Sequence, residues 1–485
     1  GTTDTYIAPQ VAGVEPTPVF EGLQKIALHF SGTDFSGVTA PPTFSVTSGN
    51  EPRPGDIEIT DWLCNNVRCG VALRLGKWLP GHGQALPSPI QGQQVRILFE
   101  GAANQISATL LVMPLDHGGG SSTSSPPHMT GTWMFYDFRL GVDVPLSVEP
   151  DATGLPGRIL VTNEISLASG ATIVASGLPG IAVPPAGGAA GPGGFPGAAS
   201  GDDAALPMGG RAGSAPGAGG GGGGFGEAGS PGEGVDPAIG GEGGSAGQGV
   251  ELDCLRANTA GCGGGGGGSA GSGEGGGGGG GGVLIVSLGT MDMAGNAIRS
   301  NGGDGAEGVT DSGGGGGAGG AIGLGVVRFT GDGSLAALGG AGGAAGAGGG
   351  AGGSGGGGRV RIDSVADLPL AVDGASLWHG PAVDVEALDV VTPDAETTMT
   401  GRGEPGATIR VTNYAVRPAQ FTETAVNADG TFTIVVPLLA GLNDFEVSQR
   451  ADGLMARSFT GTMFELSGRT VLGARIYIVR VPEVE

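Results

Sequence analysis

The chain has 485 residues, of which 109 are glycine, and its 22 basic and 46 acidic residues give a formal net charge of −24; average glycine usage is about 7%. The acidic balance excludes a protein that binds nucleic acid or an anionic membrane by neutralising phosphates. No stretch of 18 apolar residues predicts a transmembrane helix, and glycine does not recur strictly at every third position, which excludes collagen.

Glycine is concentrated in one part of the chain. Residues 178–358 contain 76 of the 109 glycines, and the flanks have nearly ordinary glycine content. From this shift in composition we expect five parts: an extended arm over 1–20, a β-sandwich over 21–157, a glycine-rich repeat region over 158–366, a second β-sandwich over 367–464, and a C-terminal strand over 465–485.

Short segments separated by turn signals predict strands in the first part of the chain. The expected strands are Lys25–Phe30, Thr43–Thr47, Ile57–Ile59, Val71–Leu75, Val95–Phe99, Ile106–Val112 and Trp133–Leu140. Their spacing is typical of a β-sandwich. We interpret Trp62, Trp78 and Trp133 as core residues in preference to the lining of a sugar site.

Four cysteines form two close pairs, Cys64 with Cys69 and Cys254 with Cys262. Each pair would close a short loop as a disulfide. Zinc is the alternative, but neither pair has the C-x-x-C spacing and no histidine follows at ligand distance. We therefore expect two disulfides, which favour an oxidising compartment outside the cytoplasm.

The glycine-rich middle contains a repeat. Each copy has an apolar start, a glycine twelve residues later, an apolar residue, and a further glycine that leads into a glycine-rich stretch. The starts are Arg158, Val283 and Ala321, with an incomplete fourth at Arg359, and the glycines are Gly170, Gly295 and Gly333. The last three starts are 38 residues apart. Each copy predicts a strand, a tight turn with positive φ at the glycine, a short strand and a glycine run.

The glycine runs allow two interpretations. A flexible linker is the ordinary one, but the repeat gives these runs a phase that a linker does not have. Polyproline-II-type helices have three residues per turn and no internal hydrogen bonds, so their backbone groups must pair with neighbouring chains. Residues 178–282 interrupt the 38-residue rhythm as an insertion that contains many prolines.

The runs at 263–268, 275–282 and 313–317 alternate with short β segments. In composition and rhythm they resemble the glycine-rich domain of anaplastic lymphoma kinase-type receptors and the polyglycine-II assemblies of phage adhesins and antifreeze proteins. The resemblance implies a rigid bundle of glycine helices. It carries no activity and no specific residue.

Three motifs follow one another in the last part of the chain. They are G-x-x-x-P-G-A-x-I-x-V from Gly401, A-D-G-T-F-x-I-x-V-P-L from Ala428 and G-x-N-x-F-x-V from Gly441. In this order, over about 385–464, they resemble a bacterial immunoglobulin-like domain of surface proteins and adhesins. The resemblance implies a β-sandwich that acts as a spacer or binding module without catalysis.

The two ends of the chain have two interpretations. The segment Val471–Val481 predicts a long strand beyond the second sandwich, and Gly1–Phe20 predicts an extended arm. In one interpretation, both segments pack on their own chain. In the other, one of them completes a sheet in a neighbouring subunit.

Catalytic motifs are absent from the sequence. The histidines at 29, 82, 117, 128 and 379 are scattered. No G-x-S-x-G motif stands in a strand–turn–helix context, and no GxxxxGK[ST] motif occurs. Calcium would use acids such as Asp304, Asp311 and Asp332, but the D-x-D-x-D density of calcium loops is missing, and we interpret them as solvated. We therefore expect no enzyme, no cofactor and no metal.

These patterns together predict an all-β protein, with two β-sandwiches flanking a polyglycine-II helix bundle built on a short β-strand repeat. The function we favour is that of a secreted bacterial structural protein, a subunit of a surface fibre, filament or layer that binds copies of itself. An adhesin that binds surface glycans is the alternative. A polysaccharide-degrading β-helix enzyme is disfavoured because the repeats carry no carboxylate cluster.

Overall fold

A computed structural model describes most of the chain. The residues outside the description are 1–10, 18, 24, 34, 47–50, 77, 80–91, 101–104, 114–116, 122–126, 152–153, 200–201, 205–208, 215–216, 235–263, 269, 271–273, 310–311, 365–369, 380–382, 387, 452–453, 458–462, 468–469 and 484–485. The protein is all-β, as predicted, with 48% strand and 1% helix. A short 3-10 helix spans Phe35–Gly37.

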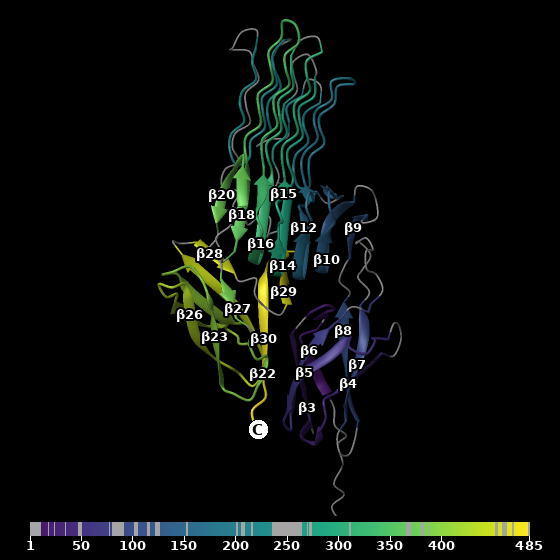
Figure 1. Cartoon of the computed structure of the whole chain (residues 1–485), viewed down its shortest axis with the longest axis vertical. Helices are drawn as coiled ribbons and strands as arrows, with labels where there is room; N and C mark the ends of the chain where they lie inside the picture. The colour runs from purple at the N-terminus through teal and green to yellow at the C-terminus, as the bar shows by residue number, and fades with distance from the viewer. Residues whose placement is uncertain are drawn as a thin grey trace, which may run out of the picture. The chain divides into compact units, whose positions relative to one another are not determined.

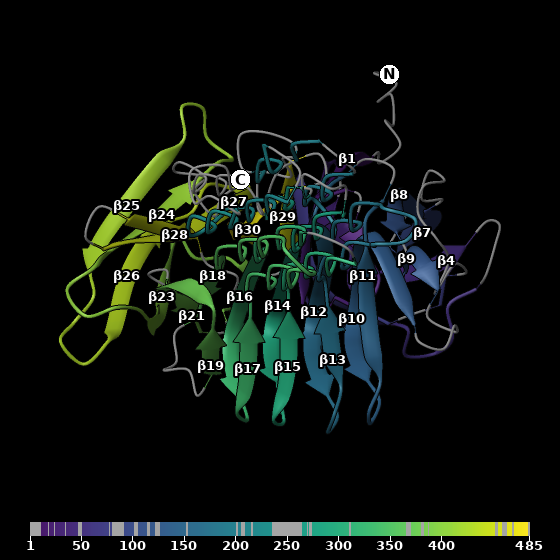
Figure 2. The ribbon, with the colours of Figure 1, turned by 90° about the horizontal axis from the view of Figure 1, so that it is seen from above.

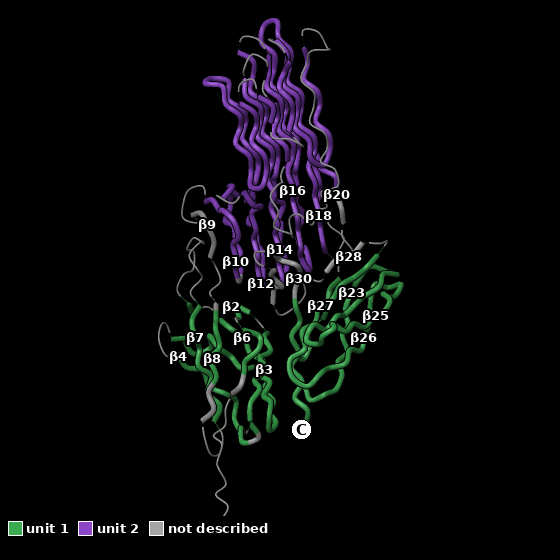
Figure 3. The backbone as a smooth tube through the Cα atoms, turned by 180° about the vertical axis from the view of Figure 1, so that it is seen from behind, with its two compact units in different colours: residues 1–117, 381–465, 473–485 green, residues 118–380, 466–472 purple. Residues whose placement is uncertain are grey.

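The chain forms two compact units that are not contiguous in sequence (Figure 3). The first unit contains residues 1–117, 381–465 and 473–485, and the second contains residues 118–380 and 466–472. The large sheet of the second unit already includes strands that precede residue 157. The composition boundary expected there therefore falls inside a sheet.

Two four-stranded sheets form the N-terminal part of the first unit. One has the order β1 (Val11–Glu15), β3 (Ile26–Gly32), β6 (Arg68–Leu75) and β5 (Ile57–Cys64), and the other has the order β2 (Val19–Phe20), β8 (Gln105–Met113), β7 (Gln93–Glu100) and β4 (Thr43–Val46). Both sheets contribute to one core, in which Phe99 packs edge-to-face on Phe30 and Phe35 at 4.9 and 5.4 Å between ring centroids. Because β1 and β2 pair within these sheets, residues 11–15 and 19–20 lie on their own chain.

The C-terminal part of the first unit contains a three-stranded and a seven-stranded sheet. The smaller has the order β21 (Asp384–Val385), β23 (Glu396–Arg402) and β26 (Thr431–Pro437). The larger has the order β22 (Val391–Thr392), β30 (Thr470–Arg480), β27 (Gly441–Ala451), β24 (Thr408–Asn413) and β25 (Gln420–Ala425), with β28 (Leu454–Arg457) on β27 and β29 (Met463–Ser467) on β30. β30 lies between β22 and β27, so this strand is used within its own chain.

A separate apolar cluster joins the two parts of the first unit. It consists of Ala27, Ala72, Val390, Val391, Val479 and Val481, all buried. Gly70 on β6 lies against it, since a Cβ there would come within 2.9 Å of a methyl group of Val479. The Asn65 amide also donates to the Pro482 carbonyl at 3.0 Å. Residues more than 300 positions apart in sequence thus share one interior.

The second unit is built on a large parallel sheet (Figures 1 and 2). Its long strands are β10 (His128–Leu140), β12 (Gly157–Leu167), β14 (Gly282–Asp292), β16 (Ala321–Thr330), β18 (Gly358–Asp363) and β20 (Ala375–His379). Its short strands are β11 (Pro145–Glu149), β13 (Thr172–Val174), β15 (Asn296–Arg299), β17 (Gly333–Ala336) and β19 (Leu370–Asp373), and β9 (His117–Ser121) pairs with β10. Residues 128–130 of β10 pair with β11 and residues 132–140 pair with β12, so β10 connects the row of long strands to the row of short ones.

Each long strand except β20 is followed by a turn and a strand of the other row. Side chains from both rows meet in one core that includes Ile159, Ile285, Ile298, Leu324 and Leu335, all fully buried or nearly so. The first residues of β12 and β14 are buried on both faces. Gly282–Val286 accordingly reads as a continuous apolar run instead of an alternating one, and Gly157–Val161 does so apart from the buried Arg158.

The register agrees with the expected repeat at one interface and differs by one residue at two others. Ala321 pairs with Arg359, as the 38-residue spacing predicts. Val283, however, pairs with Gly157 and with Ile322, one residue away from the expected partners at both interfaces. The irregularity between Ser287 and Thr290 changes the β14–β16 offset: beyond it Thr290 pairs with Arg328, 38 residues away.

The turn glycines agree with the prediction at two positions out of three. Gly170 and Gly295 have φ of 78° and 80°, as predicted. In the third copy the positive φ, 72°, belongs to Gly331, and Gly333 is the first residue of β17. The backbone requires glycine at 331, since a Cβ there would lie 2.8 Å from the Ala294 nitrogen. The prediction that the turn glycine lies twelve residues after the apolar start was therefore wrong for this copy.

Candidate functional site: the bundle of glycine runs

The glycine runs leave the large sheet and return to the same end of it. Residues 300–320 connect β15 to β16, residues 337–357 connect β17 to β18, and the long insertion connects β13 to β14. Figure 1 shows the described runs extending side by side beyond the strands. They carry no regular secondary structure of the helical or strand type. Their backbone groups must therefore find partners between runs.

The run over residues 276–282 donates hydrogen bonds with a period of three. The N–H groups of Gly276, Gly279 and Gly282 donate to the carbonyls of Ala198, Phe195 and Pro192 at 3.0, 2.9 and 2.6 Å. Those of Gly277 and Gly280 donate to Gly315 and Ala318 at 2.9 and 2.8 Å, and those of Gly278 and Gly281 to Leu178 and Ala175 at 2.9 and 2.7 Å. Successive residues thus point at three different neighbours.

The same run also accepts hydrogen bonds from three further segments. The Gly276 and Gly279 carbonyls accept from Gly188 and Gly191, the Gly277 and Gly280 carbonyls accept from Gly267 and Gly264, and the Gly278 carbonyl accepts from Gly303, all at 2.7–3.0 Å. The run is therefore surrounded by hydrogen-bonded backbone on all sides. A side chain has no free direction in such an arrangement.

A second run repeats the arrangement. Along residues 313–320, every third N–H donates to the same neighbour: Gly313, Gly316 and Gly319 to residues 350, 353 and 356; Gly314, Gly317 and Gly320 to residues 306, 303 and 300; Gly315 and Ala318 to residues 268 and 265. These bonds are 2.7–3.1 Å long. Residues 265 and 268 belong to the long insertion, so the insertion is part of the same hydrogen-bonded network as the shorter runs.

Close packing explains why these positions are glycine. A Cβ on Gly276, Gly277, Gly278 or Gly279 would overlap the carbonyl oxygen of Gly267, Gly303, Ala189 or Gly264 respectively. Each blocking atom is backbone, which cannot move aside as a flexible side chain would. The property that suits these residues to the bundle is the absence of a side chain.

Side chains reappear on the outer surface with the same period. Leu338, Ala341, Ala344 and Ala347 are exposed, whereas Gly340 and Gly343 between them are buried. In the neighbouring run, the Asn301 side-chain oxygen accepts from the Leu338 N–H at 3.0 Å, and an Asp304 carboxylate oxygen accepts from the Ala341 N–H at 2.7 Å. Polar side chains of the neighbouring run therefore accept hydrogen bonds from the surface run, where no glycine run is present to accept them.

The base of the bundle contains one aromatic contact with a charged group. Phe225 is fully buried, and the Arg359 guanidinium of β18 lies 5.2 Å from the centre of its ring. Burial lowers the pKa of Arg359 from its ordinary value. The contact links the insertion to β18 of the large sheet and provides no reactive group.

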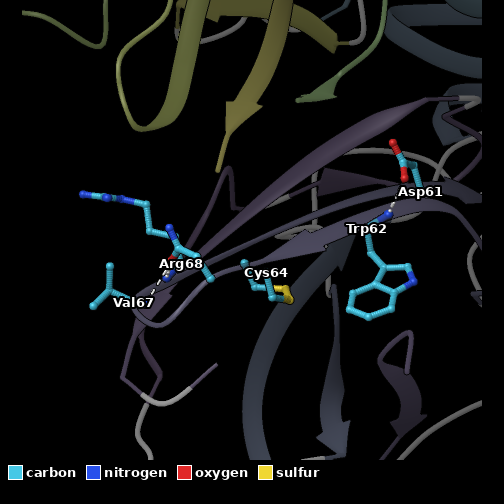
Figure 4. Close-up of a disulfide and its surroundings, with 7 residues drawn as sticks. Asp61, Trp62, Cys64, Val67 and Arg68 are labelled. Carbon is cyan, nitrogen blue, oxygen red and sulfur yellow. Dashed lines mark hydrogen bonds between the residues drawn. A yellow bond between two sulfur atoms is a disulfide. The ribbon is translucent and has the colours of Figure 1, made fainter. Parts of the chain in front are cut away.

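One of the two expected disulfides lies in the described residues. Cys64 and Cys69 face each other across the β5–β6 hairpin, are disulfide-bonded, and have Cα atoms 4.0 Å apart (Figure 4). The turn between them is held by the Asn65 side-chain oxygen, which accepts from the N–H groups of Val67 and Arg68 at 3.0 and 2.8 Å. Cys254 and Cys262 lie outside the described residues.

The other residues singled out in the sequence do not gather into a site. Trp133 is buried in the core of the large sheet, and Trp62 and Trp78 pack against the N-terminal core. Asp304 accepts a backbone N–H and Asp332 is exposed, while Asp311 and His82 lie outside the described residues. Among the residues that the structure describes, no three His, Cys, Asp or Glu side chains are grouped as metal ligands would be.

No family model matches the sequence, and no curated protein matches it. In the described part of the chain, no helix is both long enough and apolar enough to cross a bilayer.

Proposed function

We propose that this chain is an extracellular structural protein, a subunit of a surface fibre, filament or layer, in which the glycine-run bundle is a stiff element made of polyglycine-II helices. The observation that carries the proposal is the three-residue period of the hydrogen bonds along 276–282 and 313–320. Polyproline-II geometry has three residues per turn and no internal bonds, which matches donors that address three neighbours in turn.

Stiffness follows from the way the runs are bonded. Each hydrogen bond contributes only about 1 kcal/mol net, but the bonds occur at nearly every residue of the central runs and point in several directions. Bending one run therefore strains bonds to several others at once. The interior presents bonded backbone amides and few ionisable groups, an arrangement suited to a mechanical element and not to catalysis.

The remaining parts of the proposal concern the flanks and the compartment. We interpret the paired sheets around each core of the first unit as β-sandwiches, the C-terminal one of bacterial immunoglobulin-like type, because both sheets of each pair supply the buried residues. The Cys64–Cys69 disulfide supports an oxidising compartment outside the cytoplasm.

Electron microscopy of the native protein, paired with light scattering over a range of concentrations, tests this proposal. We expect regular filaments or sheets and a scattering mass that rises with concentration. Isolated particles together with a constant monomer mass, at concentrations well above those of a cell surface, would refute a role as an assembling subunit.

A further inference from the structure

The insertion begins with an apolar segment that is exposed to solvent. Leu178, Ile181 and Val183 are 59, 50 and 75% exposed. The backbone N–H groups of Ile181 and Ala186 donate to each other's carbonyls at 2.8 and 3.0 Å, so the segment closes into a small loop. No charged residue occurs between Glu164 and Asp202. Three large apolar side chains in so small an uncharged loop indicate a contact surface. We call Leu178–Val183 the apolar loop.

A pocket of matching chemistry lies in the C-terminal part of the first unit. It opens between β25 and the end of β26 and has a volume of about 110 Å³. Val411, Val436, Leu438 and Phe445 line it as buried residues, while Phe421 and Leu439 are 56 and 44% exposed. None of the residues that line it is charged. We call it the edge pocket, because β25 is the last strand on the path of its sheet.

Hydrogen bonds fix the walls of the edge pocket. The fully buried Asn443 side chain exchanges two hydrogen bonds with the Leu439 backbone, both at 2.9 Å, and accepts a third from the Asn413 amide at 2.9 Å. The Arg410 guanidinium lies 4.2 Å from the centre of the Phe421 ring and pairs with Glu423 at 2.7 Å. The pocket is thus formed before anything enters it, which lowers the entropic cost of binding.

The apolar loop and the edge pocket fit each other in size and charge. A cavity of about 150 Å³ accepts benzene, so about 110 Å³ accommodates a branched aliphatic side chain such as that of Val183 or Ile181. Copies of a chain with a net charge of −24 repel one another. Association is least opposed where the contacting residues carry no charge. The apolar loop and the lining of the edge pocket meet that condition, and the charges beside the pocket, Arg410 and Glu423, pair with each other.

We propose that one copy of the chain inserts its apolar loop into the edge pocket of the next copy. This inference rests on the proposed assembling function and assigns the contact that carries it. The two surfaces are different and belong to the same molecule, so the contact is heterologous and leaves a free loop at one end and a free pocket at the other. Such contacts propagate into open filaments unless the rotation closes a ring.

Charge-introducing variants test the contact. We expect Val183→Asp in the loop and Phe421→Asp in the pocket each to weaken association at least about tenfold in sedimentation velocity, because either carboxylate would be buried against apolar groups. Val142→Asp is the matched control, since Val142 is 65% exposed on the turn after β10; it should associate as the wild type does. Melting temperatures check folding, and Leu439→Ser replaces Phe421→Asp if that variant melts early.

A mixing experiment separates this contact from assembly in general. The loop variant keeps an intact pocket and the pocket variant keeps an intact loop, so an equimolar mixture should give a heterodimer and nothing longer. If both variants assemble as the wild type does, the assigned contact is wrong and the assembling function stands. If the wild type itself stays monomeric, the function and the contact both fail.

Discussion

At the scale of single residues, the bundle reverses the usual role of the side chain in packing. Most proteins fill their interiors with side chains, whereas Gly276 to Gly279 are surrounded by carbonyl oxygens at positions that a methyl group would occupy. Glycine is the costliest residue to order, by roughly 0.5–1 kcal/mol relative to alanine. Glycine occurs at these positions because only a backbone without side chains can approach its neighbours closely enough to form these hydrogen bonds.

A single added methyl group should therefore be destabilising in the bundle. We expect Gly279→Ala to lower the free energy of unfolding of the second unit by about 1–3 kcal/mol, because the blocking atom is the Gly264 carbonyl oxygen. Denaturant unfolding measures the change. Gly141→Ala is the control, since its Cβ would meet only a Val144 methyl group at 3.4 Å; equal effects of the two substitutions would contradict the close-packed bundle.

His29 gives the first unit a pH dependence. Burial, with a smaller effect of the Arg68 charge, lowers the pKa of His29 from 6.5 to about 4, and its Nε2 atom has no hydrogen-bond partner among the described residues. The unfolded chain therefore binds a proton at higher pH than the folded one. Stability from this residue is complete above pH 6.5 and is lost as the pH falls towards 4.

The His29→Gln variant isolates this contribution. We expect the free energy of unfolding of the wild type to fall between pH 6.5 and 4 more steeply than that of the variant, by no more than about 3 kcal/mol over the interval. Titrating carboxylates contribute equally to both proteins and cancel in the difference. Parallel pH profiles would show that His29 is as accessible to protons in the folded state as in the unfolded state.

At the scale of elements, the phase of each glycine run matters more than its length. Residues 313, 316 and 319 address one neighbour and residues 314, 317 and 320 another. A shift by one residue would aim every donor of the run at the wrong segment. A shift by three would aim every donor at its original segment again, three residues further along.

Insertions separate phase from length. We expect one glycine inserted after Gly315 to lower the melting temperature of the second unit by several degrees, and three glycines inserted at the same point to lower it less, although the second change is larger. Circular dichroism or calorimetry with temperature measures both. Equal losses, or a greater loss for the triple insertion, would show that the runs are not held by a three-residue pattern.

The sequence predicted the elements of the large sheet better than their arrangement. Strong apolar starts such as Val283 and Ala321 and glycine turns such as Gly295 are local signals, and they located β14, β16 and the turn before β15. The sequence carries no such signal for the first copy, β10 to β11, because no glycine run follows it and its turn residue with positive φ is Asp143. Local signals also do not reveal bulges, which set the register.

The sequence indicated that the glycine runs would bond to one another, but not which runs would pair. The phase of the runs indicated pairing between chains, but the choice of partners did not follow from it. Residues 188–198 of the insertion bond to residues 276–279, and residues 220–223 bond to 313–316. Runs of identical glycines are interchangeable in sequence, so the partners are decided by where the flanking strands place each run.

At the scale of the whole molecule, the two compact units stabilise themselves by different physical means. The first unit buries hydrocarbon in cores that contain Phe30, Phe99 and Phe445, whereas much of the second buries hydrogen-bonded backbone. These two kinds of surface contribute to the heat capacity of unfolding with opposite signs, about +0.45 and −0.26 cal/mol/K per Å² for apolar and polar area.

Scanning calorimetry of the full chain measures this balance. We expect a heat capacity increment on unfolding below the usual range of about 12–15 cal/mol/K per residue, because the glycine runs expose amides and little hydrocarbon. A value inside that range would mean that the runs contribute apolar surface like any other core.

A small heat capacity increment flattens the dependence of stability on temperature. Hydrophobic cores weaken on cooling because their driving force is entropic near room temperature, whereas an interior of bonded amides does not rely on that force. The glycine-run bundle would accordingly keep nearly the same stability in cold surroundings as in warm ones, and heat, not cold, would set the limit of its use.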